Sequence, residues 1–276
     1  MGIFDGCLLA CDIDGTLISN GVLPPKNVEK IKYFISEGGK FSLSSGRSAE
    51  GIMPAVRQLC DISASIVQNG AVIYDSTEKK VLKQNFLDEA DKCFVKYISE
   101  NFKSVGIKVH VGDVSYTLNR NKEVIDHETY EELKPIDVTY NDIKDIKWCK
   151  AIFFPPDSET YEKVVALTPE KHNSRFVRTN AFVYGRMRHY FEQLPNGVSK
   201  ASALADLKEI YKISDGNVFA IGDYYNDLEM ICAADIGAVT DESPDDIKEK
   251  AKYITCSCAD GAVADFIDYL TKIKGE

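Results

Sequence analysis

Short, fully apolar runs alternate with amphipathic stretches in the first part of the chain. Residues 7–11 are continuously apolar, and the stretch between Pro24 and Gly39 then places apolar side chains at helical spacing. Continuous apolar runs suit strands of a parallel sheet that is covered on both faces. A second strand, "KFSLSSGR", a helix at 48–60 and a third strand, "SIVQNGAVIYD", follow. This β-α-β-α-β order predicts a doubly wound α/β domain.

The pattern changes at about residue 83 and resumes near the C-terminus. Residues 83–188 have helices and strands of their own, but no strand there ends in paired acids. The first pattern returns at "GVSKASALADLKEIYKI", and a buried strand at 218–221 again ends near an acid, Asp223. We therefore predict a Rossmann-like doubly wound parallel sheet core, formed by residues 1–82 and 189–276. Residues 83–188 would form an inserted α/β cap domain.

Composition limits the classes of partner. The chain of 276 residues is 44% hydrophobic, which is ordinary for a globular protein, and its formal net charge is -10. That acidic balance argues against nucleic acid as a partner, although a local cation can still bind a small anion. No apolar run reaches the roughly 18 to 20 residues that a membrane span needs. No obligate protein partner is evident.

The cysteines and the N-terminus indicate a cellular compartment. The eight cysteines are scattered and form no CxxC pair, and the N-terminus lacks the features of a signal peptide. This pattern predicts a reduced, cytoplasmic protein. The four histidines have no metal-ligand spacing, so we expect them to be ordinary surface or core residues.

Acids gather where predicted strands end. Asp12 and Asp14 come directly after the first apolar run, and Asp223 and Asp227 follow the run at 218–221. In parallel α/β sheets, ligands bind beyond the carboxyl ends of the strands. Nearby carboxylates repel one another, and a hard divalent cation offsets that cost. The sequence therefore predicts an Mg²⁺ site at this edge.

Other strand and helix ends offer groups that hold phosphate. Ser45 and Gly46 follow the second strand, and Lys200 stands at a helix start. A hydroxyl and an ammonium suit a phosphate group that shares the metal. The Asp12 carboxylate could then attack phosphorus and form an acyl phosphate. Asp14, two positions after Asp12, could act as general acid and then general base.

These sites also match a known family. "DIDGT", "SSGR", Lys200 and "GDYYND" resemble, in this order, the four motifs of the haloacid dehalogenase superfamily, in its phosphatase branch. The insert lies after "QNGA" and before "GVSK", which is similar to the cap of Cof-type, subfamily IIB proteins. The resemblance covers both core segments; in the cap it is one of topology only.

The resemblance implies a role for each matching residue. Asp12 would be the nucleophile and Asp14 the acid and base, while Ser45, beside Gly46, would bind the phosphoryl group together with Lys200. Ser45 stands where the family often has Thr, and the hydroxyl is kept. Mg²⁺ would be held by Asp12, the backbone carbonyl of Asp14, and Asp223, with Asn226 and Asp227 completing or orienting the shell.

For several residues the sequence allows both a functional and a structural role. Arg47 could aid phosphate binding, but we expect a structural ion pair. Asn69 would either face the cleft or only form the Asn-Gly turn. Arg178, Arg186 and Arg188 stand out as a basic group in an acidic protein, and one of them could contact an anionic or hydroxyl-rich leaving group. We favour a solvated strand pair with alternating charges.

The predicted function is a Mg²⁺-dependent phosphatase that acts on small soluble phosphate monoesters. Sugar phosphates are the leading substrate class, followed by nucleotides, FMN and pyridoxal phosphate. One alternative is a phosphomutase of the phosphomannomutase type, because the same Asp pair serves both reactions. The other is a binding module for phosphorylated metabolites without enzyme activity.

Overall fold

The computed structural model describes residues 2–59, 61–134, 136–168, 174–183 and 186–275, with the backbone alone for Val56, 179–183 and 186–188. The chain divides into two compact units. The core unit comprises Met1–Gly46, Ile52–Leu82 and Ser199–Glu276, and the inserted unit comprises Arg47–Gly51 and Lys83–Val198.

The second junction between the units lies later than we predicted. The predicted boundary after residue 188 falls inside strand β10 (Arg186–Pro195). This strand pairs along its whole length with β9 (Ser174–Val183), so the hairpin cannot be divided there. The predicted helix at 48–60 is also shorter, because α2 spans Met53–Leu59 and residues 47–51 group with the inserted unit.

The core unit is built on a parallel sheet with the strand order β13-β12-β11-β1-β2. Its strands are β1 (Leu8–Cys11), β2 (Lys40–Leu43), β11 (Val218–Gly222), β12 (Ile236–Val239) and β13 (Tyr253–Ile254). A parallel bridge from Ser44 to Ile66 adds β3 (Ser65–Val67) beside β2. After the turn Gln68–Gly70, β3 pairs antiparallel with β4 (Val72–Asp75), which is followed by β5 (Lys80–Gln84).

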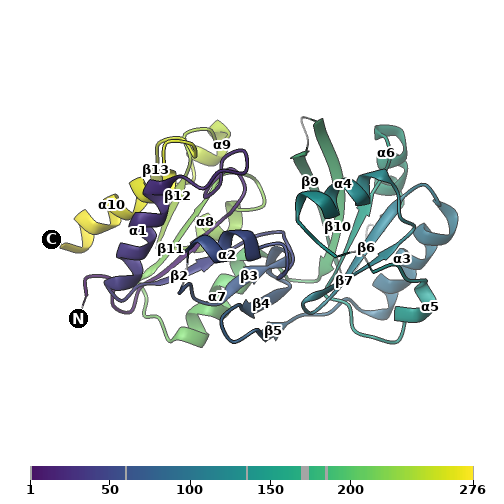
Figure 1. Cartoon of the computed structure of the whole chain (residues 1–276), viewed down its shortest axis with the longest axis horizontal. Coiled ribbons are helices and arrows are strands. Elements are labelled where there is room, and N and C mark those ends of the chain that lie inside the picture. Colours follow the sequence, from purple (N-terminus) through teal and green to yellow (C-terminus); the bar gives the residue numbers. More distant parts are fainter. Residues whose placement is uncertain (1, 60, 135, 169–173, 184–185, 276) are drawn as a thin grey trace. The chain divides into compact units, whose positions relative to one another are not determined.

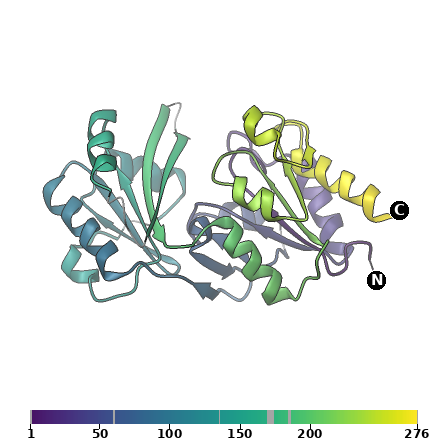
Figure 2. The same ribbon diagram turned by 180° about the vertical axis from the view of Figure 1, so that it is seen from behind.

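Helices cover both faces of this sheet. Helices α1 (Pro25–Ser36) and α10 (Ala262–Gly275) lie on one face, and α7 (Lys200–Tyr211) and α8 (Leu228–Ala233) lie on the other (Figures 1 and 2). The short α9 (Asp245–Lys248) follows β12. Leu8 and Ala10 pack with Leu204 and Leu207 of α7, and alternate residues of β1 face the opposite layer. The predicted doubly wound core is confirmed.

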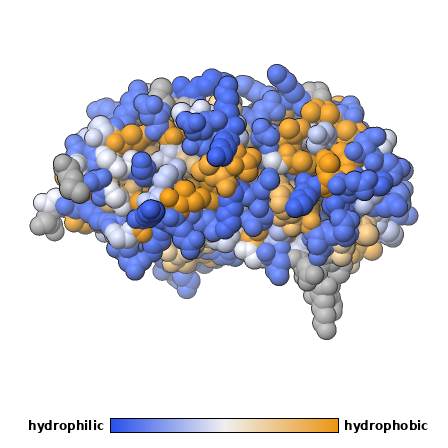
Figure 3. All heavy atoms as spheres, turned by 90° about the horizontal axis from the view of Figure 1, so that it is seen from below, coloured by the Kyte–Doolittle hydropathy of each residue, from blue (hydrophilic) through white to orange (hydrophobic). Residues whose placement is uncertain are grey.

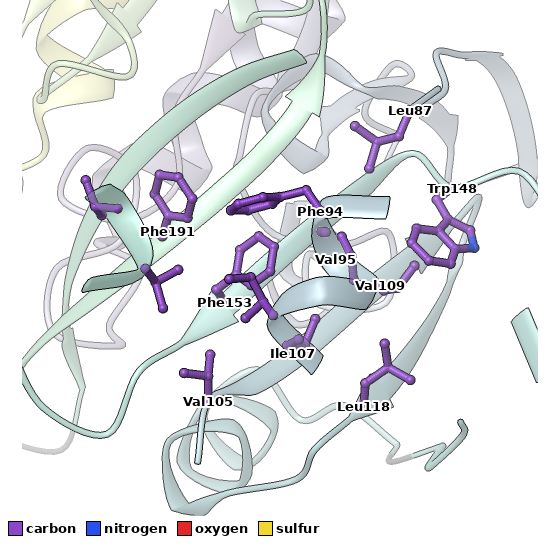
Figure 4. Close-up of a cluster of buried hydrophobic side chains, with 14 of the residues drawn as sticks. Leu87, Phe94, Val95, Val105, Ile107, Val109, Leu118, Trp148, Phe153 and Phe191 are labelled. Atoms are coloured by element: carbon purple, nitrogen blue, oxygen red, sulfur yellow. The ribbon is translucent and has the colours of Figure 1, made fainter. Parts of the chain in front are cut away.

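The inserted unit has an antiparallel sheet with the order β7-β6-β8-β10-β9. Strands β6 (Gly106–Val111), β7 (Val114–Leu118) and β8 (Lys150–Phe154) complete it. One face packs on α3 (Glu89–Asn101) and α6 (Ser158–Ala166) through a core that includes Phe94, Phe153 and Phe191 (Figure 4). The opposite face packs on α4 (Lys122–Tyr130), and α5 (Tyr140–Ile143) precedes β8.

The face drawn in Figure 3 is mostly hydrophilic, with apolar side chains showing between hydrophilic ones. Among the described residues, no helix combines the length and the apolar character needed to cross a bilayer.

Candidate active site

The paired acids lie at the carboxyl ends of two adjacent strands. Cys11 at the end of β1 pairs in register with Ile221 of β11, so Asp12 and Asp223 leave the sheet side by side. The backbone N–H of Asp12 donates to the carbonyl of Ile221 at 3.0 Å, which continues the ladder by one residue. The parallel pairing of two buried strands therefore brings together acids that are far apart in the sequence.

Lys200 reaches this edge from the first turn of α7. Ser199 caps the helix, and its hydroxyl accepts a hydrogen bond from the N–H of Ser202 at 3.2 Å. The Lys200 Nζ lies 2.6 Å from Oδ1 of Asp12 and 2.5 Å from Oδ1 of Asp227. All three side chains are buried, and buried charges persist only when they are paired.

Burial shifts the proton affinities of these groups. Burial raises the pKa of Asp12 well above its usual range and Asp227 adds to the effect, while Lys200 acts against it. For the same reasons the pKa of Asp223 rises to about 7. Burial lowers the pKa of Lys200, but its contacts with Asp12 and Asp227 outweigh that effect, so the pKa lies above its usual value and the side chain is charged. A cation bound here would favour the ionised carboxylates.

The acids form a group that fits a hard metal ion. Asp12, Asp223 and Asp227 each offer a carboxylate oxygen, and these oxygens lie within 4.8 Å of one another. Asp12 and Asp227 are buried and Asp223 is half-buried, and a single ammonium, that of Lys200, contacts the first two, so the group has more acids than bases. Oxygen ligands of this kind suit Mg²⁺, which also keeps part of its shell for water or substrate.

Local hydrogen bonds orient two of these acids. The Thr16 hydroxyl donates to Oδ1 of Asp223 at 3.1 Å, and Oδ2 of Asp227 accepts backbone N–H groups from Asp223 at 3.3 Å and Tyr224 at 3.4 Å. Gly15 has a φ of +85°, and a Cβ atom there would lie 2.5 Å from Oδ2 of Asp223. Only glycine allows this approach.

The predicted site residues take different places in this arrangement. The carboxylate of Asp227, which we expected to complete or orient the metal shell, belongs to the acidic group. The Asp14 side chain is exposed and lies outside that group, and Asn226 is half-buried in the loop after β11. Thr16 was missed, although it is the last residue of "DIDGT", because threonine in a turn has an ordinary local explanation.

The Ser45–Gly46 loop lies at the ends of β2 and β3. Ser45 is buried, and its N–H donates to the carbonyl of Ile66 at 2.9 Å. Its own carbonyl accepts the N–H of Asn69 at 3.0 Å. Asn69 is buried and has a left-handed φ of 54°. Asn69 thus forms the turn and borders the Ser45–Gly46 loop, and a role in the cleft stays a prediction.

The arginines have different surroundings. Arg47 donates from Nη1 to the carbonyl of Gly51 at 3.2 Å, and its guanidinium lies 5.3 Å from the ring centroid of Tyr130. Arg178 is exposed on β9. The side chains of Arg186 and Arg188 lie outside the described part of the chain, as does the whole of His172. Their predicted roles stay predictions.

Comparison with known proteins identifies the family. A model of the haloacid dehalogenase-like hydrolases matches residues 9–267, which is nearly the whole chain. The chain belongs to this family. A curated relative, the 5-amino-6-(5-phospho-D-ribitylamino)uracil phosphatase YwtE of Bacillus subtilis (strain 168), is 26% identical; the match covers 95% of this chain and 97% of the relative.

Solved structures share the fold of this family member. A haloacid dehalogenase-like hydrolase from Bacteroides thetaiotaomicron has a TM-score of 0.82 at 23% identity, over 96% of this chain and 99% of that one. A subclass IIB sugar phosphatase has a TM-score of 0.80 at 17% identity, over 96% and 98% of the two chains. The predicted superfamily and the prediction of a phosphatase enzyme are confirmed, and the fold agrees with the predicted IIB branch.

Proposed function

We propose that this hydrolase is a Mg²⁺-dependent phosphatase that cleaves small phosphate monoesters through a phosphoryl group carried on Asp12. The observation that carries the proposal is the buried group in which Lys200 contacts Asp12 and Asp227 while Asp223 lies beside them. A structural salt bridge needs one acid per base. An excess of carboxylates around one lysine supports a site built for a cation and an anionic substrate.

The chain's own residues supply the chemistry in two steps. In the first, a carboxylate oxygen of Asp12 bonds to phosphorus while the bond from phosphorus to the ester oxygen breaks, and Asp14 gives that oxygen a proton. In the second, Asp14 takes a proton from water, the water oxygen bonds to phosphorus, and the bond to Asp12 breaks. Inorganic phosphate leaves, and both acids return to their starting states.

Charge neutralisation is the main task of the surrounding groups. Phosphoryl transfer depends on positioning and on stabilising the charge of the phosphoryl oxygens. Lys200 fixes the Asp12 carboxylate in one orientation and offers positive charge, and the Ser45 hydroxyl and the Gly46 N–H would hold phosphoryl oxygens. Mg²⁺ held by Asp12, Asp223 and the backbone carbonyl of Asp14 would supply further positive charge, with Asp227 and Asn226 completing or orienting the shell.

Phosphorylated sugars or sugar alcohols are the substrate class we favour. Subclass IIB contains a sugar phosphatase of the same fold, and the curated relative from Bacillus subtilis acts on a phosphorylated ribityl compound by its name. Both names therefore point to substrates that carry phosphate on a polyhydroxylated compound. Nucleotides, FMN and pyridoxal phosphate come next. We keep the cytoplasm as the proposed compartment, and one of Arg178, Arg186 and Arg188 as a proposed contact to the leaving group.

The test is release of inorganic phosphate from a panel of phosphorylated sugars, sugar alcohols, nucleotides and cofactors. Each compound is assayed with Mg²⁺ and with EDTA, and the Asp12→Asn variant, purified in the same way, serves as the blank for contaminating phosphatases. Release that needs both Mg²⁺ and Asp12 supports the proposal and names the substrate class. If no compound is hydrolysed, sugar monophosphates are assayed again with a sugar bisphosphate. Isomerisation without phosphate release would then favour the mutase.

A further inference from the structure

The turn Gln68–Gly70 between β3 and β4 is strained and buried. Three successive residues have left-handed backbones, with φ values of 54° for Gln68, 54° for Asn69 and +99° for Gly70. Left-handed conformations cost energy for residues that have a Cβ atom, and they persist only where the surroundings fix them. A plain hairpin connection does not need three of them in a row.

On one side, the turn contacts the Ser45–Gly46 loop. The N–H of Asn69 donates to the Ser45 carbonyl at 3.0 Å. The side-chain amide of Asn69 lies over Gly46, where a Cβ atom would be 3.2 Å from both Nδ2 and Oδ1. The turn therefore fixes the backbone of Ser45 and covers the residue that follows it.

On the other side, the turn contacts the first residues of α7. A Cβ atom on Gly70 would lie 2.2 Å from the carbonyl oxygen of Ser199 and 3.2 Å from the backbone nitrogen of Lys200. Ser199 is the N-cap of the helix, so it is the backbone at the helix start that packs against the turn. Glycine is required here both by its φ and by the lack of space.

We propose that the Gln68–Gly70 turn is a positioning element that sets the distance between the Ser45–Gly46 loop and Lys200, with Asn69 and Gly70 as its positioning residues. The inference rests on the proposed function, in which these two places hold the phosphoryl group. They come from β2 and α7, which lie far apart in the sequence, and this turn has close contacts with both. Its strained backbone is explained by the need to fit between them.

Gly70→Ala tests the proposal, with Gly216→Ala as the matched control. Gly216 also has a left-handed φ, of +83°, but no atom lies within 4 Å of a Cβ placed there. Both variants strain the backbone in the core unit, and only Gly70→Ala must displace the start of α7. Misplacement of a positioned group by about 1 Å costs on the order of a hundredfold in rate.

We therefore expect Gly70→Ala to lower kcat/KM by about ten- to a hundredfold, by a similar factor for every substrate, because the change lies at the phosphoryl end. Inhibition by inorganic phosphate should weaken in parallel. Gly216→Ala should lower the melting temperature but leave kcat/KM and the inhibition by inorganic phosphate unchanged per folded molecule. Equal kcat/KM values in the two variants would overturn the proposal.

Asn69→Gly provides a second test if Gly70→Ala does not fold. It keeps the left-handed backbone and its N–H but removes the amide over Gly46. Asn119→Gly in the inserted unit, where Asn119 has a φ of 48°, is the control. Calorimetry with inorganic phosphate should show weaker binding for Asn69→Gly alone, and wild-type affinity there would contradict the proposal. Because this measurement needs no turnover, it is independent of the substrate assay, which tests the proposed function.

Discussion

The Lys200 Nζ lies 2.6 Å from Oδ1 of Asp12, although the two residues are 188 positions apart in the chain. The contact joins the end of the first core strand to the start of a helix that follows the whole inserted unit. It requires the two core segments to fold together, because neither segment alone can pair both charges. The acidic edge of the sheet is therefore formed only when the core is complete.

Asp12→Asn is expected to abolish turnover and leave the fold intact. Asparagine has the shape of aspartate but is a far weaker nucleophile, so kcat should fall by more than about a thousandfold. Far-ultraviolet circular dichroism and the melting temperature check the fold. Asp215→Asn, at an exposed acid of the same unit, is the control and should retain full activity. Substantial turnover in Asp12→Asn would show that the nucleophile is another group.

Lys200→Met should destabilise the protein and make its stability depend on metal. Removing the lysine leaves Asp12 and Asp227 buried without their cation, and breaking a buried ion pair costs about 3 to 5 kcal/mol. Mg²⁺ should restore part of that loss, since a cation can replace the ammonium charge. Urea unfolding with and without Mg²⁺ measures both effects.

Lys208→Met is the matched control for Lys200→Met. Lys208 lies on the same helix, α7, but its partner Asp215 is exposed. Exposed ion pairs contribute little to stability, so this variant should unfold close to the wild type. Equal losses of stability in the two variants would contradict the special role of the buried lysine.

Gly15→Ala is expected to weaken metal binding. The added Cβ atom would approach Oδ2 of Asp223 to 2.5 Å and push that carboxylate from its place. Changes to groups that orient metal ligands typically cost about ten- to a hundredfold in affinity. Calorimetric titration with Mg²⁺ measures the loss. Gly21→Ala, at a φ of +79° with no atom within 4 Å of its Cβ, should bind Mg²⁺ as the wild type does.

The core fold and the main acids could be predicted because they have strong local signals. Apolar runs such as residues 7–11 define buried strands, and the strand-end rule places Asp12 and Asp223 together. The orientation of the Asp227 carboxylate could not be predicted, because it depends on how the loop after β11 folds back so that Oδ2 accepts the backbone N–H groups of Asp223 and Tyr224.

The end of the inserted unit was predicted less well. Residues 174–195 contain arginines and aromatic residues without a break in composition, so the sequence gives no sign that both strands of the hairpin belong to one sheet. The grouping of residues 47–51 with the inserted unit has no sequence signal either. Both features depend on tertiary packing, which local patterns do not encode.

Two buried histidines of the inserted unit should make its stability depend on pH. Burial, with Lys108 and Lys150 adding to it, lowers the pKa of His127 to about 3. Burial and the same two lysines lower the pKa of His110 well below its usual range. Glu131 lies 3.4 Å from Nε2 of His127, which would favour the charged imidazole, but burial dominates. Both rings are therefore neutral in the folded protein.

Acid should destabilise the wild type relative to His127→Phe. Below about pH 6.5 the unfolded chain binds a proton at residue 127 that the folded protein excludes, so the free energy of unfolding falls by up to about 1.4 kcal/mol per pH unit. The raised pKa of Asp223 acts in the opposite direction in both proteins and cancels in the comparison. Phenylalanine keeps the ring contacts with Phe154 and Tyr190. Urea unfolding at several pH values between about 7.5 and 5 measures the difference, and parallel curves would show that the pKa of His127 is the same in the folded and unfolded states.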